Sequence, residues 1–223
     1  MKTLYFTKID YIRSRTQLYL ISVILAVVIM ILKFITDGTD VMVFLYGIFI
    51  TIVFSTVPFG NCSRKDAGFL QLLPATVWHR VLGRFLFGLS LLMIGSAISA
   101  GCMVVYRLYV GAEENVIVLP FCMIILSVGL VFITVQYIAL YLVGENYGAQ
   151  FLSLVRMIPG MCFFFGSMKL LEEARQNPES AMKLLELISD RPYVISLGSI
   201  VIALAVMAAG VVLCVKMTEK RDY

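Results

Sequence analysis

Charged side chains are scarce in this chain of 223 residues, which has 14% Asp, Glu, Lys and Arg against 61% hydrophobic residues. A soluble globule of this size needs far more polar surface than such a composition provides. The composition therefore excludes an ordinary soluble domain and directs attention to long apolar segments.

Histidine and paired cysteines are also scarce. The chain has one histidine, His79, and its five cysteines form no CxxC pair. A zinc site needs several such ligands, so one is excluded. Cys102 and Cys122 both fall near one predicted face of the membrane, where a disulfide bridge is conceivable. The simpler interpretation of all five cysteines is small apolar residues in helices.

Motifs for nucleotide binding and hydrolysis are missing. No GxxxxGK[ST] sequence occurs, so the chain has no P-loop with which to bind ATP, and no GxSxG sequence occurs either. The paired glutamates of Glu172–Arg175 match a membrane-protease motif only in part, because the arginine is too close and the necessary histidines are absent. No acid lies inside the apolar runs, so nothing predicts a proton relay. The incomplete motifs disfavour an intramembrane enzyme, and the missing relay weighs against a proton-driven secondary transporter.

Six long apolar runs dominate what the sequence does contain. They cover residues 17–36, 41–60, 82–108, 116–143, 151–170 and 193–215. A helix of about 20 apolar residues spans roughly 30 Å of hydrocarbon. The predicted fold class is therefore an all-α membrane protein, with six transmembrane helices in a single transmembrane domain over residues 1–223. A kink is expected at Pro159-Gly160.

Cations are concentrated on one set of connecting segments. The N-terminal segment, the second and fourth connections and the C-terminal tail together carry twelve cations and five acids, whereas the opposite side carries six cations and nine acids. Segments rich in Lys and Arg stay in the cytoplasm. Both termini are thus predicted to be cytoplasmic. The net charge of +4 follows from this topology and needs no nucleic-acid partner.

Two segments outside the crossings have helical patterns. Residues 1–16 carry apolar side chains at helical spacing among cations, which predicts an amphipathic helix on the cytoplasmic membrane surface. An unstructured basic tail is the alternative. Residues 171–191 contain a second helical pattern, which is too short and too charged to span and therefore predicts an external helical element.

The longest cytoplasmic connection predicts a short helix of its own at residues 63–73. Ser63 and Asp66 fit a capping box, in which each side chain bonds the other residue's backbone amide. Pro74 ends the element, because it disfavours helical geometry at the preceding residue. Thr76 can then cap the next helix.

A few polar or soft side chains lie inside the predicted crossings. Arg84 is close to an inner end and can extend its charge to the interface. Arg156 lies roughly 9 Å deep, where it either extends to the interface in the same way or lines a water-filled cavity. Gln136 either bonds a neighbouring helix or lines a pathway. Met161 belongs to a Met- and Phe-rich surface that is either packing or an adaptable lining for cargo.

Small residues in the third run predict close helix packing. They form two overlapping patterns, Gly95-x-x-x-Ser99 and Ala97-x-x-x-Gly101. Such patterns let another helix backbone approach closely in a membrane.

The sequence SRKDAGFLQLLPATVWHRVLGRF at residues 63–85 resembles the membrane subunits of ABC-2 type exporters. The order of elements extends the resemblance over essentially the whole chain, from an N-terminal helix through six crossings to a short basic tail. In size the chain is most similar to small bacterial permeases, including those that export phenol-soluble modulins and other antimicrobial peptides. Family members often carry glutamate ahead of the coupling helix, where this chain offers Asp66.

The resemblance implies that residues 1–16 are an elbow helix and residues 63–73 a coupling helix that docks into a separate ABC ATPase subunit. The docking residues would be Asp66, Ala67, Gly68, Phe69, Leu70, Gln71 and Leu72, and the candidate pathway residues would be Gln136, Arg156 and Met161.

Two permease copies, as a homodimer rather than a heterodimer, and two ATPase subunits would then export amphipathic peptides or other hydrophobic cargo. ATP and Mg would bind to the ATPase, so this chain would be a non-catalytic subunit without a cofactor. It would lie in the lipid bilayer of the bacterial plasma membrane and bind no nucleic acid. The alternative is a stand-alone six-helix secondary transporter or a substrate-binding membrane subunit.

Overall fold

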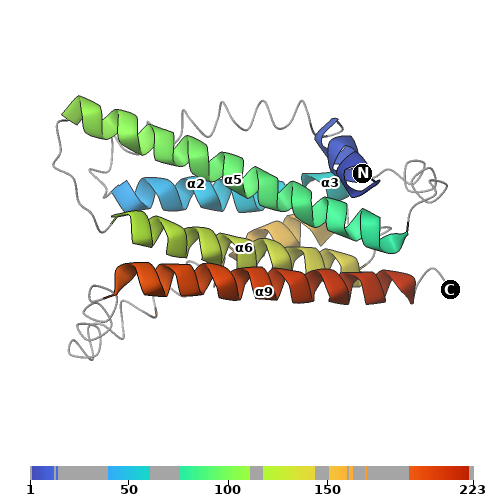
Figure 1. Ribbon diagram of the computed structural model, residues 1–223. Coiled ribbons are helices and arrows are strands. Elements are labelled where there is room, and N and C mark those ends of the chain that lie inside the picture. Colours follow the sequence, from blue (N-terminus) through green and yellow to red (C-terminus); the bar gives the residue numbers. More distant parts are fainter. Residues whose placement is uncertain are drawn as a thin grey trace.

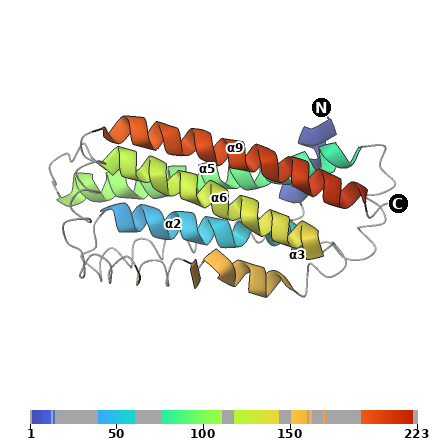
Figure 2. The same cartoon turned by 90° about the horizontal axis from the view of Figure 1, so that it is seen from below.

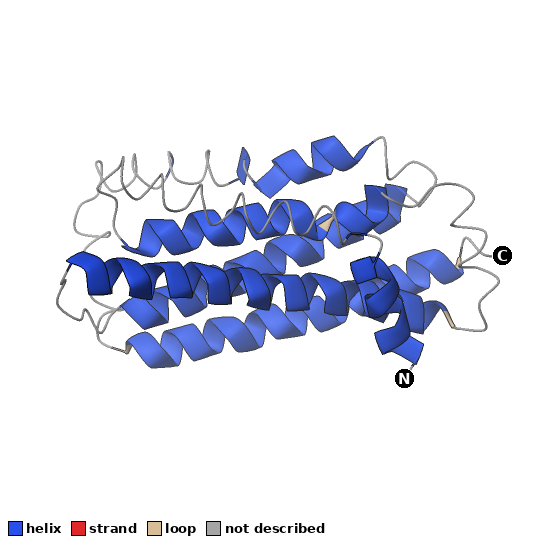
Figure 3. Cartoon of the chain, turned by 90° about the horizontal axis from the view of Figure 1, so that it is seen from above, coloured by secondary structure: helices blue, strands red, loops and turns tan. Residues whose placement is uncertain are grey.

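The computed structural model describes residues 2–12, 14, 40–60, 76–110, 118–143, 151–159, 161–162, 169 and 191–220. Its helices are α2 (Asp40–Ser55), α3 (Val57–Gly60), α5 (Val77–Val110), α6 (Val118–Val143) and α9 (Pro192–Glu219). Residues 2–12 and 151–159 are also helical. The described residues contain no strand, so the prediction of an all-helical protein is confirmed (Figure 1, Figure 3).

Three helices are long and apolar enough to cross a membrane. They are Val77–Val104, Leu119–Val143 and Pro192–Glu219, and they match the third, fourth and sixth predicted crossings. Gly47–Phe59 is apolar but shorter. The predicted first crossing at 17–36 and the predicted coupling helix at 63–73 lie outside the described residues, as does the external element at 171–191 apart from Arg191.

Four long helices lie side by side, with α6 in contact with α2, α5 and α9 (Figure 2). Glycines allow the closest of these approaches. A Cβ at Gly129 of α6 would lie 2.8 Å from Ile48 Cγ2 of α2, and a Cβ at Gly210 of α9 would lie 2.5 Å from Thr134 Cγ2 of α6. The bundle is therefore packed around α6 by the absence of side chains at these points.

One of the two small-residue patterns in α5 packs as predicted. Gly95 and Ser99 are buried, and a Cβ on Gly95 would collide with the Thr51 side chain of α2. Ala97 and Gly101 are exposed, and a Cβ on Gly101 would meet nothing within 4 Å. The second pattern therefore does not bring a described helix close, because it points to the opposite side of α5.

The third predicted crossing forms part of a longer helix. α5 begins at Val77 rather than at residue 82, because the first turn already closes where the His79 amide donates to the Thr76 carbonyl at 3.0 Å. The Thr76 hydroxyl bonds Nδ1 of the His79 ring at 2.5 Å and not a backbone amide, which differs from the predicted cap. α9 begins with Pro192 in its first turn, a position where the missing proline N–H removes no helical bond.

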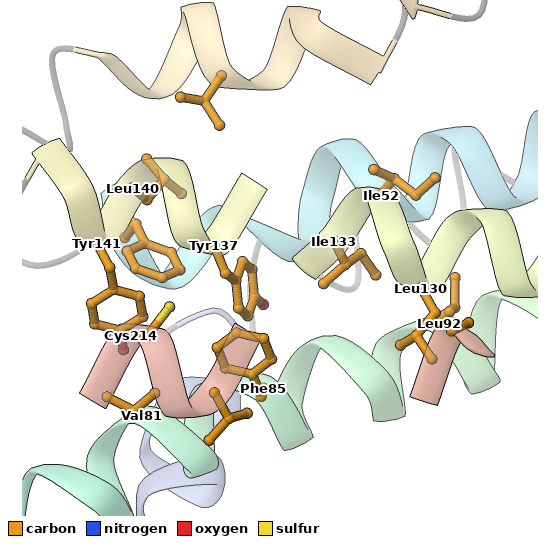
Figure 4. Close-up of a cluster of buried hydrophobic side chains, with 14 of the residues drawn as sticks. Ile52, Val81, Phe85, Leu92, Leu130, Ile133, Tyr137, Leu140, Tyr141 and Cys214 are labelled. Atoms are coloured by element: carbon orange, nitrogen blue, oxygen red, sulfur yellow. The ribbon is translucent and has the colours of Figure 1, made fainter. Parts of the chain in front are cut away.

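A hydrophobic cluster fills the space between α2, α5, α6 and α9. Figure 4 shows Phe85 of α5 facing Tyr137 of α6, with Tyr141 of α6 beside Cys214 of α9. Cys102 and Cys122 are free thiols, so the disulfide considered for the third and fourth crossings does not form.

Candidate functional site

The second predicted crossing is broken near its C-terminal end. α2 ends at Ser55 and α3 begins at Val57, with a turn at Thr56. Pro58 accounts for the break, because it has no amide hydrogen for the carbonyl four residues earlier and its ring clashes with that carbonyl. The prediction of one continuous helix over residues 41–60 is therefore wrong at this point.

A hydroxyl group from α6 bonds a backbone carbonyl at the break. In a regular helix the Ser55 carbonyl would accept the amide of Phe59. Here the Phe59 amide donates to the Thr56 carbonyl at 3.1 Å, and the Tyr137 hydroxyl donates to the Ser55 carbonyl at 2.8 Å. A buried carbonyl left without a donor costs about 1–3 kcal/mol. The Tyr137 hydroxyl thus satisfies a carbonyl that would otherwise be unpaired in an apolar interior.

The Tyr137 ring reaches the break through space that a glycine leaves open. A Cβ on Gly88 of α5 would lie 2.7 Å from the Tyr137 oxygen and 3.1 Å from its Cζ. The ring packs edge to face against Phe59 and Phe85, each at a centroid distance of 5.1 Å. Tyr137 is fully buried, so its orientation is fixed on several sides.

A helix that contains a proline packs against the same part of α6. Residues 151–159 are helical, and Pro159 offers no amide hydrogen to the Val155 carbonyl. The Gln136 amide nitrogen Nε2 donates to that carbonyl at 3.2 Å instead. Gln136 Oε1 is buried and has no hydrogen-bond partner among the described residues. Two consecutive residues of α6 therefore each bond a backbone carbonyl close to a proline.

A side-chain hydrogen bond joins the helix of residues 151–159 directly to the turn between α2 and α3. Arg156 Nε donates to the Thr56 hydroxyl oxygen at 2.8 Å, and that hydroxyl donates to the Val53 carbonyl at 2.9 Å. In Figure 2 the helix of residues 151–159, drawn in gold, lies beside α2 and α3. Arg156 is half-buried, so part of its guanidinium lies between helices.

Arg84 of α5 is held on aromatic rings at the same break. Its guanidinium carbon lies 4.6 Å from the centroid of the Phe59 ring and 5.8 Å from that of Tyr141. Only 6% of Arg84 is exposed, so the prediction that it extends to the interface is wrong. The negative ring faces of Phe59 and Tyr141 replace water as partners of the charge.

The N-terminal helix of residues 2–12 packs against the N-terminal half of α5. The Thr7 hydroxyl donates to the Gly83 carbonyl at 3.1 Å, and the hydroxyls of Tyr11 and Ser90 lie 2.7 Å apart. Its exposed apolar side chains are Leu4, Tyr5 and Ile12. One side of this helix therefore joins the bundle, and the other has an apolar surface.

The predicted site residues have different outcomes. The docking residues Asp66–Leu72 lie outside the described residues. Gln136 and Arg156 come together, because Gln136 bonds the carbonyl of Val155, the neighbour of Arg156. Met161 is 55% exposed. No observation tests the docking or pathway roles, which stay predictions.

Sequence reasoning missed Tyr137 and the break that it stabilises. Pro58 inside an apolar run was the available signal, since a proline there disturbs the helical hydrogen bonds of its neighbours. The identity of that donor was not predictable, because Tyr137 lies 82 residues from Ser55 in the chain.

A comparison with protein families identifies the chain. A family model described as "ABC-2 family transporter protein" matches residues 6–219, which is nearly the whole sequence. The chain belongs to the ABC-2 transporter family. No curated protein and no solved structure gives a significant match.

Membership of this family confirms the resemblance to ABC-2 permeases. The ABC-2 protein is thus a multi-pass membrane protein, in agreement with its span-length helices. Membrane subunits of this family are typically non-catalytic transport subunits and imply an ABC ATPase as partner.

Proposed function

We propose that this ABC-2 protein is the membrane-spanning permease subunit of an ATP-driven exporter. The family match over residues 6–219 carries the proposal. The sequence supports it, because a chain without a P-loop or a proton relay needs an energy source on another subunit. ATP and Mg bind to that ATPase subunit, and this chain carries no cofactor.

The proposed architecture has six crossings with both termini in the cytoplasm of a bacterium. Residues 1–16 act as the elbow helix, residues 63–73 as the coupling helix and residues 171–191 as the external element. The asymmetry of Lys and Arg between the two sides supports this orientation in the plasma membrane. The packing of residues 2–12 against α5 is compatible with an elbow that is fixed to the bundle.

The proposed docking segment Asp66–Leu72 follows shortly after α3, which ends at Gly60. A displacement of this segment by the ATPase is therefore passed first to α3. Contacts of α3 with Arg84 and Tyr137 then connect the displacement to α5 and α6. ATP-driven closure of two ATPase subunits would move both coupling helices and reopen the pathway outward.

Two copies of the chain form the proposed pathway, which carries amphipathic peptides or other hydrophobic cargo. Arg156 and Met161 belong to the segment that we assign to the lining, together with Gln136 beside them. Met157 and Met161 are both largely exposed, and flexible methionine side chains adapt to varied apolar cargo.

Co-purification with a candidate ABC ATPase, such as one whose gene neighbours the gene of this chain, tests the proposal. We expect a stable complex that hydrolyses ATP and that Phe69→Ala with Leu72→Ala dissociates. A matched control is Val201→Ala with Leu204→Ala, which removes exposed apolar side chains of α9 that do not belong to the proposed docking segment. A chain that never binds the ATPase and transports alone would favour the secondary transporter instead.

A further inference from the structure

Two neighbouring residues of α6 each bond a backbone carbonyl of another helix, one in α2 and one in the helix of residues 151–159. Tyr137 bonds the Ser55 carbonyl at the end of α2, and Gln136 bonds the Val155 carbonyl in the helix of residues 151–159. Consecutive helical residues project about 100° apart, so one turn of α6 contacts two different helices. Both side chains are fully buried.

The break in α2–α3 has two possible hydrogen-bond arrangements. In the structure, the Phe59 amide bonds the Thr56 carbonyl and Tyr137 bonds the Ser55 carbonyl. If Tyr137 withdraws, the Phe59 amide can bond Ser55 in the ordinary helical pattern. The tyrosine hydroxyl therefore stabilises the broken arrangement against a straighter one.

In the helix of residues 151–159, the Val155 carbonyl lacks its ordinary helical donor. Pro159 cannot donate to the Val155 carbonyl, so Gln136 Nε2 is its donor. The other half of the Gln136 amide is unpaired among the described residues. A buried acceptor without a partner raises the free energy of this arrangement. It thereby reduces the free-energy difference from a second arrangement.

We propose that Gln136 and Tyr137 are positioning residues of the transport cycle. They hold α3 and the helix of residues 151–159 in one of two arrangements, and their release lets both helices move. The hydrogen bond between Arg156 and Thr56 makes the two helices move together. This inference rests on the proposed function, since it places α3 between the docking segment and the pathway.

Hydrogen–deuterium exchange of the permease–ATPase complex tests the role of Tyr137. In Tyr137→Phe we expect exchange in residues 53–60 to change about tenfold without nucleotide, as the break shifts toward the straighter arrangement, which corresponds to about 1.4 kcal/mol. Tyr11→Phe is the matched control, because it removes a part-buried tyrosine hydroxyl whose hydrogen-bond partner is the Ser90 hydroxyl and not the Ser55 carbonyl. Equal exchange in both variants would overturn the role of Tyr137.

A double-mutant cycle tests the role of Gln136. In Gln136→Leu we expect about tenfold faster exchange over residues 151–158. Pro159→Ala supplies the missing amide to the Val155 carbonyl, so adding Gln136→Leu to that variant should change exchange little. An equal effect of Gln136→Leu in both backgrounds would show that the bond to Val155 is not its role.

Nucleotide dependence separates a positioning role from a purely structural one. In the wild-type complex, trapping with ATP and vanadate should change exchange in both segments. In Tyr137→Phe and Gln136→Leu this change should shrink and kcat for ATP hydrolysis should shift, while KM for ATP stays constant. An unaltered nucleotide response in both variants would overturn the proposal. A wild-type chain that never binds the ATPase would instead contradict the proposed function.

Discussion

A methyl group added at Gly88 of α5 should disrupt the hydrogen bond between Tyr137 and the break in α2–α3. In Gly88→Ala the new Cβ would lie 2.7 Å from the Tyr137 oxygen and 3.0 Å from Ile133 Cγ2. Tyr137 cannot retreat easily, because Phe59 and Phe85 hold its ring. The methyl group should therefore displace the hydroxyl from the Ser55 carbonyl.

Three contributions determine how much Gly88→Ala changes the free energy of unfolding. Overpacking costs about 1–3 kcal/mol, and the lost hydrogen bond costs about 0.5–1.5 kcal/mol. Alanine gains up to about 1 kcal/mol over glycine in a helix. Gly88→Ala should therefore lower the free energy of unfolding by about 0.5–4.5 kcal/mol.

Unfolding in mixed detergent micelles measures this change, followed by fluorescence of the single tryptophan Trp78 in α5. Gly101→Ala is the matched control in the same helix, because its Cβ would meet nothing within 4 Å. It should leave stability unchanged or raise it slightly. Equal stability of Gly88→Ala and Gly101→Ala would refute the reasoning about Tyr137.

Three further predictions follow from the same contacts. Arg84→Ala should lower the free energy of unfolding by about 0.5–2 kcal/mol in the same assay through loss of the ring contacts, whereas no change would mean that the rings do not bind the charge. Gly95→Ala should destabilise the α2–α5 contact, and Thr51→Ala added to it should restore part of the loss; additive losses would contradict the predicted collision. A green fluorescent protein fused to the C-terminus should fluoresce in the cytoplasm and a fused alkaline phosphatase should be inactive, and the reverse result would invert the topology.

Much of the fold followed from local properties of the sequence. The apolar runs at 82–108, 116–143 and 193–215 predicted α5, α6 and α9, because length and hydropathy alone decide whether a helix can span a bilayer. The loop motif at residues 63–85 pointed to the ABC-2 family, and the family match over residues 6–219 confirmed it.

Errors arose where the outcome depends on a distant partner. Arg84 lies near the end of an apolar run, a pattern that predicts extension to the interface. The structure instead places its charge on Phe59 and Tyr141, which come from two other helices. Likewise, Gly95 and Gly101 have equivalent sequence patterns, and only the packing of α2 against one face of α5 distinguishes them.

The sequence by itself determined the all-helical membrane class, the main apolar helices and the family, because these depend on composition, run length and short motifs. Only the tertiary structure decided which side chains serve the carbonyls near Pro58 and Pro159. The prolines indicate locally that backbone donors are missing, but only the packing of α6 against both segments brings Tyr137 to the Ser55 carbonyl and Gln136 to the Val155 carbonyl.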